Sequence, residues 1–267
     1  MPHGESWFSL LPFHEKLVHL AAYLGRPFNE EGLTWYAHQH PGIQHIYAAI
    51  LVLFILVILS VVTDTSIRES GKNLLPADKL TIRNFVELVV GTAYKMMSDI
   101  MGAKAARYFL PLIGTCAFFI LISNALGLIP GFLPATDNFN TTLGAGLIIF
   151  AATHIYGLKE NGTKHIAHFF GPWLGPLGLP LNILMFFIEL ISHIARPISL
   201  GIRLMANMTA DHMVLTIFLG LLPTSLFFIP IPLPMYLLGT IVVIVQTLVF
   251  CLLSTVYIAM AIEHAEH

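Results

Sequence analysis

Charged residues and cysteines are scarce in this chain of 267 residues. Only 10% of the residues are charged and 56% are hydrophobic, whereas an average soluble domain is about 25% charged, so an ordinary soluble domain is excluded. The two cysteines, Cys116 and Cys251, both lie in apolar stretches, which argues against a disulfide framework and a cysteine metal site. The sequence has no phosphate-binding GxxxxGK(S/T) loop and no visible internal repeat. The absences together leave a membrane protein with no nucleotide chemistry of its own.

Several apolar stretches reach the length of about 20 residues that crosses a bilayer. We predict an all-α polytopic membrane protein with five transmembrane helices and one interfacial amphipathic helix. Residues 1–44 are expected to form an extracytoplasmic, solvated segment, because their histidines match no compact metal-ligand set. Residues 45–267 are expected to form a single membrane domain. Its spans are predicted at about 46–62, 108–129, 139–158, 181–222 and 235–262.

The amphipathic helix is predicted at about residues 80–104. Its apolar residues recur at the i, i+3, i+4 and i+7 spacing of one helical stripe. Arg83–Glu87 and Lys95–Asp99 are expected to form charge pairs one turn apart. The segment is too charged to cross a membrane, so it is predicted to lie along the interface. The stripe consists of Ile82, Phe85, Val86, Val89, Ala93, Met96, Met97 and Ile100.

The last two predicted helices are unusually long. Residues 181–222 would make a helix of about 63 Å at 1.5 Å per residue, but the hydrocarbon core is only about 30 Å thick. This helix must tilt, bend at Pro197 or Gly201, or extend beyond the membrane. With residues 235–262 it forms a long C-terminal hairpin, which we predict to be steeply tilted.

Lysine and arginine predict the orientation, because loops rich in them stay in the cytoplasm. Residues 63–107 contain seven of these residues, whereas the links at 130–138 and 223–234 contain none. We therefore predict a periplasmic N-terminus and a cytoplasmic C-terminus in a bacterial inner membrane.

Arg203 is the most informative residue, because it lies well inside an apolar helix. A cation near the bilayer centre costs about 2.5–3.5 kcal/mol on insertion scales and needs a partner or a task. An ion pair with Asp211, or a side chain that reaches the interface, would be a purely structural explanation. Asp211 lies about 80° round the helix from Arg203, which is a poor position for a dedicated partner. We interpret Arg203 as functional.

Polar residues gather on the face that contains Arg203. Ser199, Asn207 and Glu189 lie within about 40° of it on a helical wheel, and we expect this face, with Gly201 nearby, to receive another helix.

Two further polar positions leave alternatives open. Glu189 and His193 are one turn apart and form either a proton relay or, with Arg196, a local ion-pair cluster. In the last helix Gln246 is a lone amide, whose simplest role is a hydrogen bond between helices.

The run Pro197-Ile-Ser-Leu-Gly-Ile-Arg-Leu-Met-Ala-Asn207 closely resembles the signature of the F-type ATP synthase a subunit family. Asn124-Ala-Leu-Gly-Leu-Ile-Pro130, Glu189 and Gln246 extend the resemblance over most of the chain. The resemblance implies a non-catalytic, proton-translocating stator subunit with two offset half-channels that couple proton flow to rotation and ATP synthesis. The implied partners are the c-ring, the b subunit of the peripheral stalk, the rest of the F1Fo complex and the lipid bilayer, with no nucleic acid and no cofactor.

The same resemblance implies individual roles. Arg203 would face the c-ring carboxylate, Asn207 and Gln246 would lie near the outer half-channel, and Glu189 and Ser199 near the cytoplasmic one. The sequence departs from the family at two outer positions. His212 stands where glutamate is common, and Gly239 stands where histidine or glutamate is common.

These departures predict a differently lined outer path, with Asp211 and water as candidates. His212 lies about 180° round the helix from Arg203, so it should face the stator interior, where Gly239 leaves space. We expect His212 either to assist proton uptake or to fill a gap with a hydrogen bond to a backbone carbonyl.

Two other protein classes fit the sequence less well. A free-standing channel or secondary transporter should show repeats or paired broken helices. An intramembrane metalloprotease would need an HExxH motif, and His264-Ala-Glu-His267 lacks that spacing. The sequence does not distinguish H⁺ from Na⁺ as the coupling ion.

Overall fold

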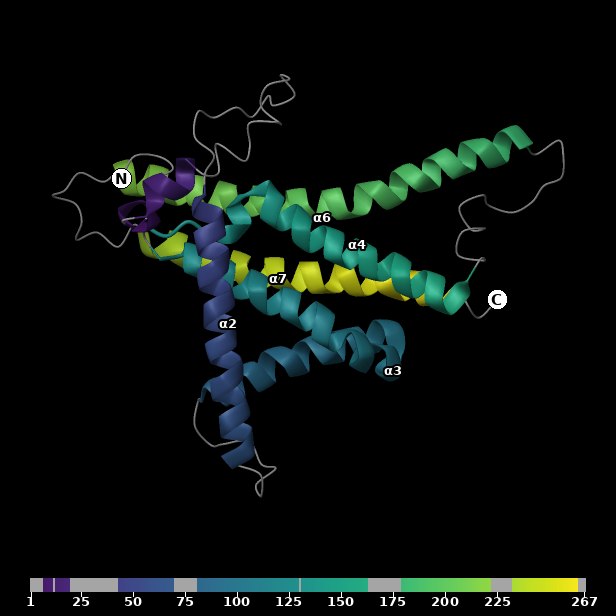
Figure 1. Ribbon diagram of the computed structural model, residues 1–267, viewed down its shortest axis with the longest axis horizontal. Helices are drawn as coiled ribbons and strands as arrows, with labels where there is room; N and C mark the ends of the chain where they lie inside the picture. Colours follow the sequence, from purple (N-terminus) through teal and green to yellow (C-terminus); the bar gives the residue numbers. More distant parts are fainter. Residues whose placement is uncertain are drawn as a thin grey trace.

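The computed structural model describes residues 7–11, 13–19, 43–69, 81–129, 131–162, 179–221 and 232–263, and within these ranges it is helical without strands (Figure 1). Five of the helices contain a stretch long and apolar enough to cross a membrane. The predicted fold class, an all-α polytopic membrane protein, is therefore confirmed. The main elements in chain order are η1 (Trp7–Leu10), α2 (Gln44–Glu69), α3 (Ile82–Gly127), η2 (Ala135–Asp137), α4 (Phe139–Asn161), α6 (Leu179–Leu221) and α7 (Pro232–Glu263).

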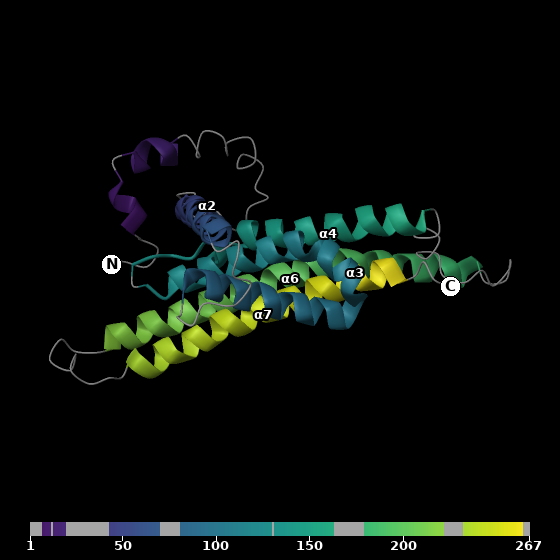
Figure 2. The same cartoon turned by 90° about the horizontal axis from the view of Figure 1, so that it is seen from below.

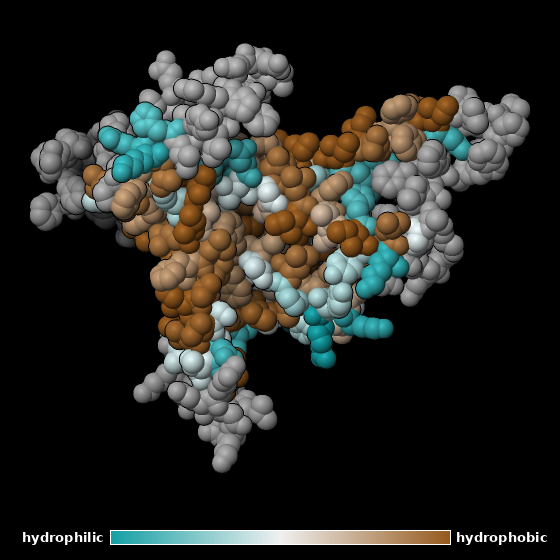
Figure 3. Space-filling model, in the orientation of Figure 1, coloured by the Kyte–Doolittle hydropathy of each residue, from teal (hydrophilic) through white to brown (hydrophobic). Residues whose placement is uncertain are grey.

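α2 differs in direction from the other long helices. In both views α4, α6 and α7 run alongside one another, whereas α2 crosses them steeply (Figures 1 and 2). The surface of α2 is hydrophobic along most of its length (Figure 3), with side chains such as Phe54 and Val57 each 62% exposed. Such a surface suits contact with lipid or with another membrane subunit.

α3 combines the predicted amphipathic helix and the second predicted span, joined by a sharp kink. At Gly102 the backbone has φ +79° and ψ 157°, a conformation that residues with a side chain rarely adopt. The kink turns the chain back on itself before residues 103–127 (Figure 1). In the first half the predicted Arg83–Glu87 ion pair is present at 2.6 Å, whereas Lys95–Asp99 is not among the ion pairs of the described residues.

α6 and α7 form the predicted long hairpin. α6 has 43 residues and remains one helix through Pro197, and α7 has 32 residues, so they are about 64 Å and 48 Å long at 1.5 Å per residue. Both exceed the bilayer core of about 30 Å. If α2 crosses the membrane upright, the hairpin must be steeply inclined, because it crosses α2.

The core is formed by α3, α4, α6 and α7, with α3 packed chiefly against α7 and α4 packed against α6 and α7. Hydrophobic attraction between helices is weak in lipid, so close fit and small residues hold such a bundle together. A Cβ added at Gly146 of α4 would lie 2.8 Å from the carbonyl oxygen of Pro197, and one at Gly201 would lie 3.1 Å from Cα of Leu143. These two glycines therefore permit the close approach of α4 and α6. The fully buried core includes Met97, Ala106, Ile113, Ile120, Leu204 and Ile258.

Several predicted segments lie mostly outside the described residues. They are the greater part of the N-terminal segment 1–44, residues 70–80 and 163–178, and the link at 222–231. The proposed division into an N-terminal segment and a membrane domain stays a prediction.

Candidate functional site

Arg203 lies on an exposed face of α6, near the middle of the helix. Ser199 and Asn207, one turn before and after it, are exposed on the same face. Around them are apolar side chains such as Ile198 and Ile202, which are 39% and 46% exposed. A shallow open hollow of about 600 Å³ runs along this face from Ile191 to Arg203. The face is thus apolar except for a single cation and two small polar groups.

The orientation of Arg203 follows from the residues on the other side of the helix. Leu200, Leu204 and Met208 recur every four residues and are 3%, 0% and 0% exposed, so they hold α6 against the bundle. Gly201 also faces inward, against Leu143 of α4. Gly201 therefore permits the close approach of α4 of the same chain, and the contact of the Arg203 face with a further helix stays a prediction.

Arg203 has no acidic partner among the described residues. The ion pairs found there are Arg83–Glu87 and His193–Glu189. Asp211 does not pair with Arg203. Instead, its Oδ2 lies 2.9 Å from the position of a Cβ added at Gly239 of α7. The purely structural explanation of Arg203 as half of an Arg203–Asp211 pair is excluded.

Asn207 joins α6 to α7. Its Nδ2 donates a hydrogen bond of 2.7 Å to Oε1 of Gln246, which is 4% exposed. This is the interhelical hydrogen bond expected of Gln246, and it places that amide one turn from Arg203. An amide at this position can offer both a donor and an acceptor to a passing polar group.

The second half of α6 carries a polar group that we call the Asp211 cluster: Asp137, Thr209, Asp211, His212 and Gly239. Asp211 and His212 are neighbours in sequence but face different helices. His212 Nε2 lies 2.6 Å from the position of a Cβ added at Gly127 of α3, and the Asp211 carboxylate fills the space at Gly239. Asp211, one of the two candidates for lining the outer path, therefore lies with Leu128 in the space that Gly239 leaves.

The sequence analysis missed two members of this cluster, Thr209 and Asp137. Thr209 Oγ1 donates to Asp137 Oδ1 at 2.5 Å, and Asp137 and Asp211 both act electrostatically on His212. From η2 the polar network continues into α3, where Thr136 Oγ1 donates to Asn124 Oδ1 at 2.5 Å. The available signal was Asp137 itself, the only acid in the link at 130–138.

The first half of α6 carries a second group, the Glu189 cluster: Glu189, His193, Arg196 and the neighbouring His154 of α4. Oε1 of Glu189 lies 3.0 Å from Nε2 of His193, whose side chain is 11% exposed. Arg196 does not join this pair; its guanidinium lies over the ring of Tyr257, 5.4 Å from the centroid. The predicted Glu189–His193 contact therefore exists, and Arg196 contributes a cation–π contact to α7 instead.

Arg203 stands between the two clusters along α6. At 1.5 Å per residue, it lies about 21 Å from Glu189 and about 12 Å from Asp211 along the helix axis. Within the part of the chain that the structure describes, no group of three or more His, Cys, Asp or Glu side chains could hold a metal ion. The arrangement offers proton-exchanging groups on either side of one permanent cation.

Comparison with known proteins identifies related sequences. A family model described as ATP synthase A chain matches residues 45–259. The ATP synthase subunit a of Sorangium cellulosum is 43% identical over 241 residues, which cover 88% of this chain and 90% of that protein. The ATP synthase subunit a of Geobacter sp. strain M21 is 40% identical over 245 residues, 91% of this chain and 98% of that protein. That of Geobacter sulfurreducens is 46% identical over 186 residues, 69% of this chain and 76% of that protein.

Proposed function

The chain belongs to the ATP synthase A chain family, and from this premise we propose that it forms two offset half-channels that load and unload protons on a ring of c subunits. The chain is a non-catalytic membrane subunit of the ATP synthase complex. In this role, proton flow through the chain turns the ring, and the rotation drives ATP synthesis in partner subunits.

The exposed Arg203 is the observation that carries this proposal. A guanidinium facing lipid is strongly unfavourable, and among the described residues it has no acidic partner. The exposed hollow along its face is otherwise lined by apolar side chains and Ser199. A carboxylate supplied by a neighbouring helix, as on a c-ring, would neutralise the cation and cover the apolar face at once.

The mechanism follows from the solvation of the carboxylate. A carboxylic acid on the rotor crosses lipid only when it is protonated, because a bare carboxylate in hydrocarbon is strongly disfavoured. Arg203 stabilises the ionised carboxylate as it passes between the half-channels. It also blocks a direct proton leak, because a guanidinium does not release its proton at physiological pH. The membrane potential supplies about 2.3 kcal/mol per proton for each 100 mV.

The two clusters supply the half-channels in this proposal. We assign the outer path to Asn207, Gln246, Asp211 and His212, and the cytoplasmic path to Ser199, Glu189 and His193. Glu189 and Asp211 are 22 residues apart, or about 33 Å along α6. If α6 is steeply inclined, much of this distance lies parallel to the membrane plane, so the two paths are laterally offset. The ring must then rotate for a proton to go from one path to the other.

The orientation in this proposal puts the N-terminus in the periplasm and the C-terminus in the cytoplasm of a bacterial inner membrane. Trp7 N donates to the carbonyl of Gly131 at 3.0 Å, so residues 7–10 and the link at 131–138, which contains no lysine or arginine, share one side. The Asp211 cluster, through Asp137 and Pro134, lies on that side too. The outer assignment of the cluster and the basic-residue rule therefore agree.

The partners follow from the exposed surfaces. The Arg203 face of α6 is assigned to the c-ring. The apolar surface of α2 is available to the b subunit and to lipid, and the remaining F1Fo subunits complete the complex.

The test is Arg203→Ala in the whole complex, reconstituted in vesicles. We expect the subunit to assemble while ATP-driven proton pumping falls by about a hundredfold or more, the scale on which a preorganised charge-stabilising donor acts. Leu147→Ala, at an exposed position of α4 outside this face (48% exposed), is the control and should pump normally. Normal pumping by Arg203→Ala would overturn the proposed function.

A further inference from the structure

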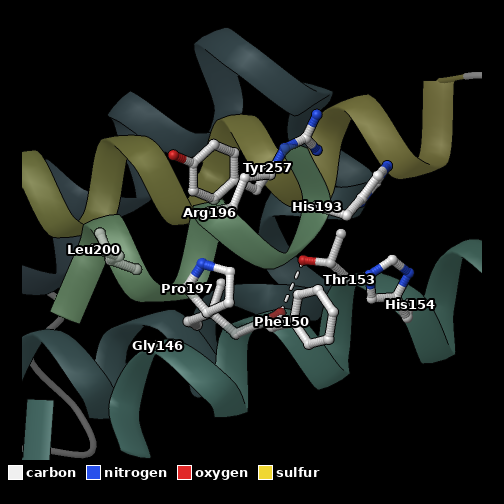
Figure 4. A pocket seen from close by; sticks show the side chains of 10 residues that line it. Gly146, Phe150, Thr153, His154, His193, Arg196, Pro197, Leu200 and Tyr257 are labelled. Carbon is white, nitrogen blue, oxygen red and sulfur yellow. Dashed lines mark hydrogen bonds between the residues drawn. The ribbon is translucent and has the colours of Figure 1, made fainter. Parts of the chain in front are cut away.

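A small, partly open pocket lies between α4, α6 and α7 in the first half of α6 (Figure 4). Its volume of about 10 Å³ is close to the minimum that holds one water molecule. Apolar side chains such as Phe150, Pro197 and Leu200 form one part of its wall. His154, His193 and Arg196 give the rest of the wall a polar, basic character.

Two imidazoles from different helices meet at this pocket. The ring centroids of His154 on α4 and His193 on α6 are 5.1 Å apart, with the planes inclined at 46°. His154 is held from behind by Phe150, one turn earlier, in an edge-to-face contact of 4.3 Å. His193 is held by Glu189, one turn earlier on α6. A continuous series of proton-exchanging groups thus runs from Glu189 through His193 to His154.

Of the charged groups around the pair, Glu189 contacts His193, whereas the nearby cations are directed at aromatic rings. Arg196 is directed at the ring of Tyr257 on α7, and Lys159, further along α4, lies 5.9 Å from the ring centroid of Tyr156. Among the described side chains facing the pair, Glu189 is the acid. Each cation is therefore engaged with an aromatic ring and stands clear of the Glu189–His193 contact.

We propose that His154 is a proton-relay residue that carries the cytoplasmic path across from α6 to α4. The inference rests on the proposed function and deepens it, since it extends the path beyond Glu189 and His193. In this step the Glu189 carboxyl gives its proton to Nε2 of neutral His193. The proton on the second ring nitrogen of His193 then leaves, directly or through one water, to His154. His154 releases its own second ring proton toward the aqueous side.

The balance of this step is simple. One proton arrives and one leaves, no electrons move, and each imidazole returns to the neutral form with its proton on the other nitrogen. His154 lies five residues before Lys159 in the last turns of α4, so the path ends close to the end of that helix.

The experiment compares His154 variants of the whole complex in vesicles. His154→Phe keeps a ring for the contact with Phe150 but has no exchangeable proton, and His154→Gln keeps polarity without a basic ring nitrogen. We expect both to slow passive and ATP-driven proton movement several-fold while ATP hydrolysis and assembly are retained. Ile155→Phe, at a neighbouring position that is 63% exposed, is the matched control and should behave as the parent.

A second measurement separates a relay from packing. In His154→Ala, added imidazole should restore proton movement, whereas pyrrole, a ring of similar size with no basic nitrogen, should not. Normal rates in His154→Phe and His154→Gln, or equal restoration by both compounds, would overturn the relay.

The Arg203→Ala complex, measured in parallel, separates this failure from a failure of the proposed function. If Arg203→Ala stops pumping while the His154 variants are normal, only the relay is wrong. If Arg203→Ala also pumps normally, the proposed function and the relay are both wrong.

Discussion

The outward orientation of Arg203 is set by packing residues that take no part in the proposed proton paths. Leu200, Leu204 and Met208 are buried along the opposite face of α6, and Gly201 lets that face approach α4 closely. Rotation of α6 about its axis would bury the guanidinium and expose leucine. The apolar packing inside the chain therefore determines which face the rotor would meet.

At His212 the structure sharpens a prediction about proton uptake. We expect His212→Leu to slow passive proton conduction several-fold, because it removes the exchangeable group between Asp137 and Asp211. His212→Glu should retain most of the conduction, since a carboxyl also exchanges protons. The measurement is proton flux through vesicles that contain the Fo sector alone.

A packing role for His212 would have a different result. His212 packs against Gly127. If it only fills this space, His212→Leu and His212→Glu should affect conduction equally. Equal, near-normal conduction in the two variants would show that His212 acts only by packing.

Among the helices, α6 has one face that packs within the chain and one face that carries the polar residues of the candidate site. One side packs on α4 and α7, and the other carries Ser199, Arg203 and Asn207 in the open. In a helix of 43 residues, such a division over several turns requires close packing that keeps the helix from rolling. Gly146 and Gly201 supply it, since each leaves room for backbone at van der Waals distance.

The division of α6 predicts a pattern of disulfide crosslinks. In a chain with Cys116 and Cys251 replaced, cysteines at Ser199 and Asn207 should crosslink to cysteines near the carboxylate of a c-ring helix. Cysteines at Leu200 and Leu204, on the same turns but buried, should not. Crosslinking is measured in the assembled complex under mild oxidation.

The informative comparison is between adjacent positions. Crosslinks at Leu200 and Leu204 but none at Ser199 and Asn207 would show that the c-ring contacts the face of α6 opposite to Arg203, contrary to the prediction. A complete lack of crosslinks at 199 and 207 would count against contact with the ring.

For the whole molecule, α2 provides the reference direction. It is the helix with the least buried span, and the long hairpin crosses it steeply (Figures 1 and 2). If α2 is upright in the bilayer, α6 brings its two ends toward opposite surfaces at well-separated places. This geometry is what an obligatory rotation between two proton paths needs.

The orientation of the molecule is testable by labelling from either side. Leu10, which is 70% exposed, and Lys104, which is exposed beside the Gly102 kink, are suitable cysteine positions. We expect a membrane-impermeant maleimide to label Leu10→Cys only from the periplasmic side and Lys104→Cys only from the cytoplasmic side. The reverse pattern would invert the assignment of the two half-channels.

The sequence by itself determined what depends on local patterns. Apolar stretches of bilayer length, the amphipathic stripe of residues 80–104 and the length of the C-terminal hairpin follow from composition and period. Arg203 was recognisable because a charge in an apolar helix is costly wherever its neighbours lie. The Asn207–Gln246 hydrogen bond was partly foreseeable, since a lone amide in lipid needs a partner.

Only the tertiary structure decided which helices meet and in what register. Asp137 with Thr209, Asp211 with Gly239 and His154 with His193 join residues on different elements. Their meeting depends on how far each helix is rotated and shifted along its neighbour. The close contacts of Gly146 and Gly201 set that rotation and shift for α4 and α6, and the kink at Gly102 sets the path of α3. A pattern along one chain contains the period of each helix but not its rotation, so these pairings could not be read from the sequence.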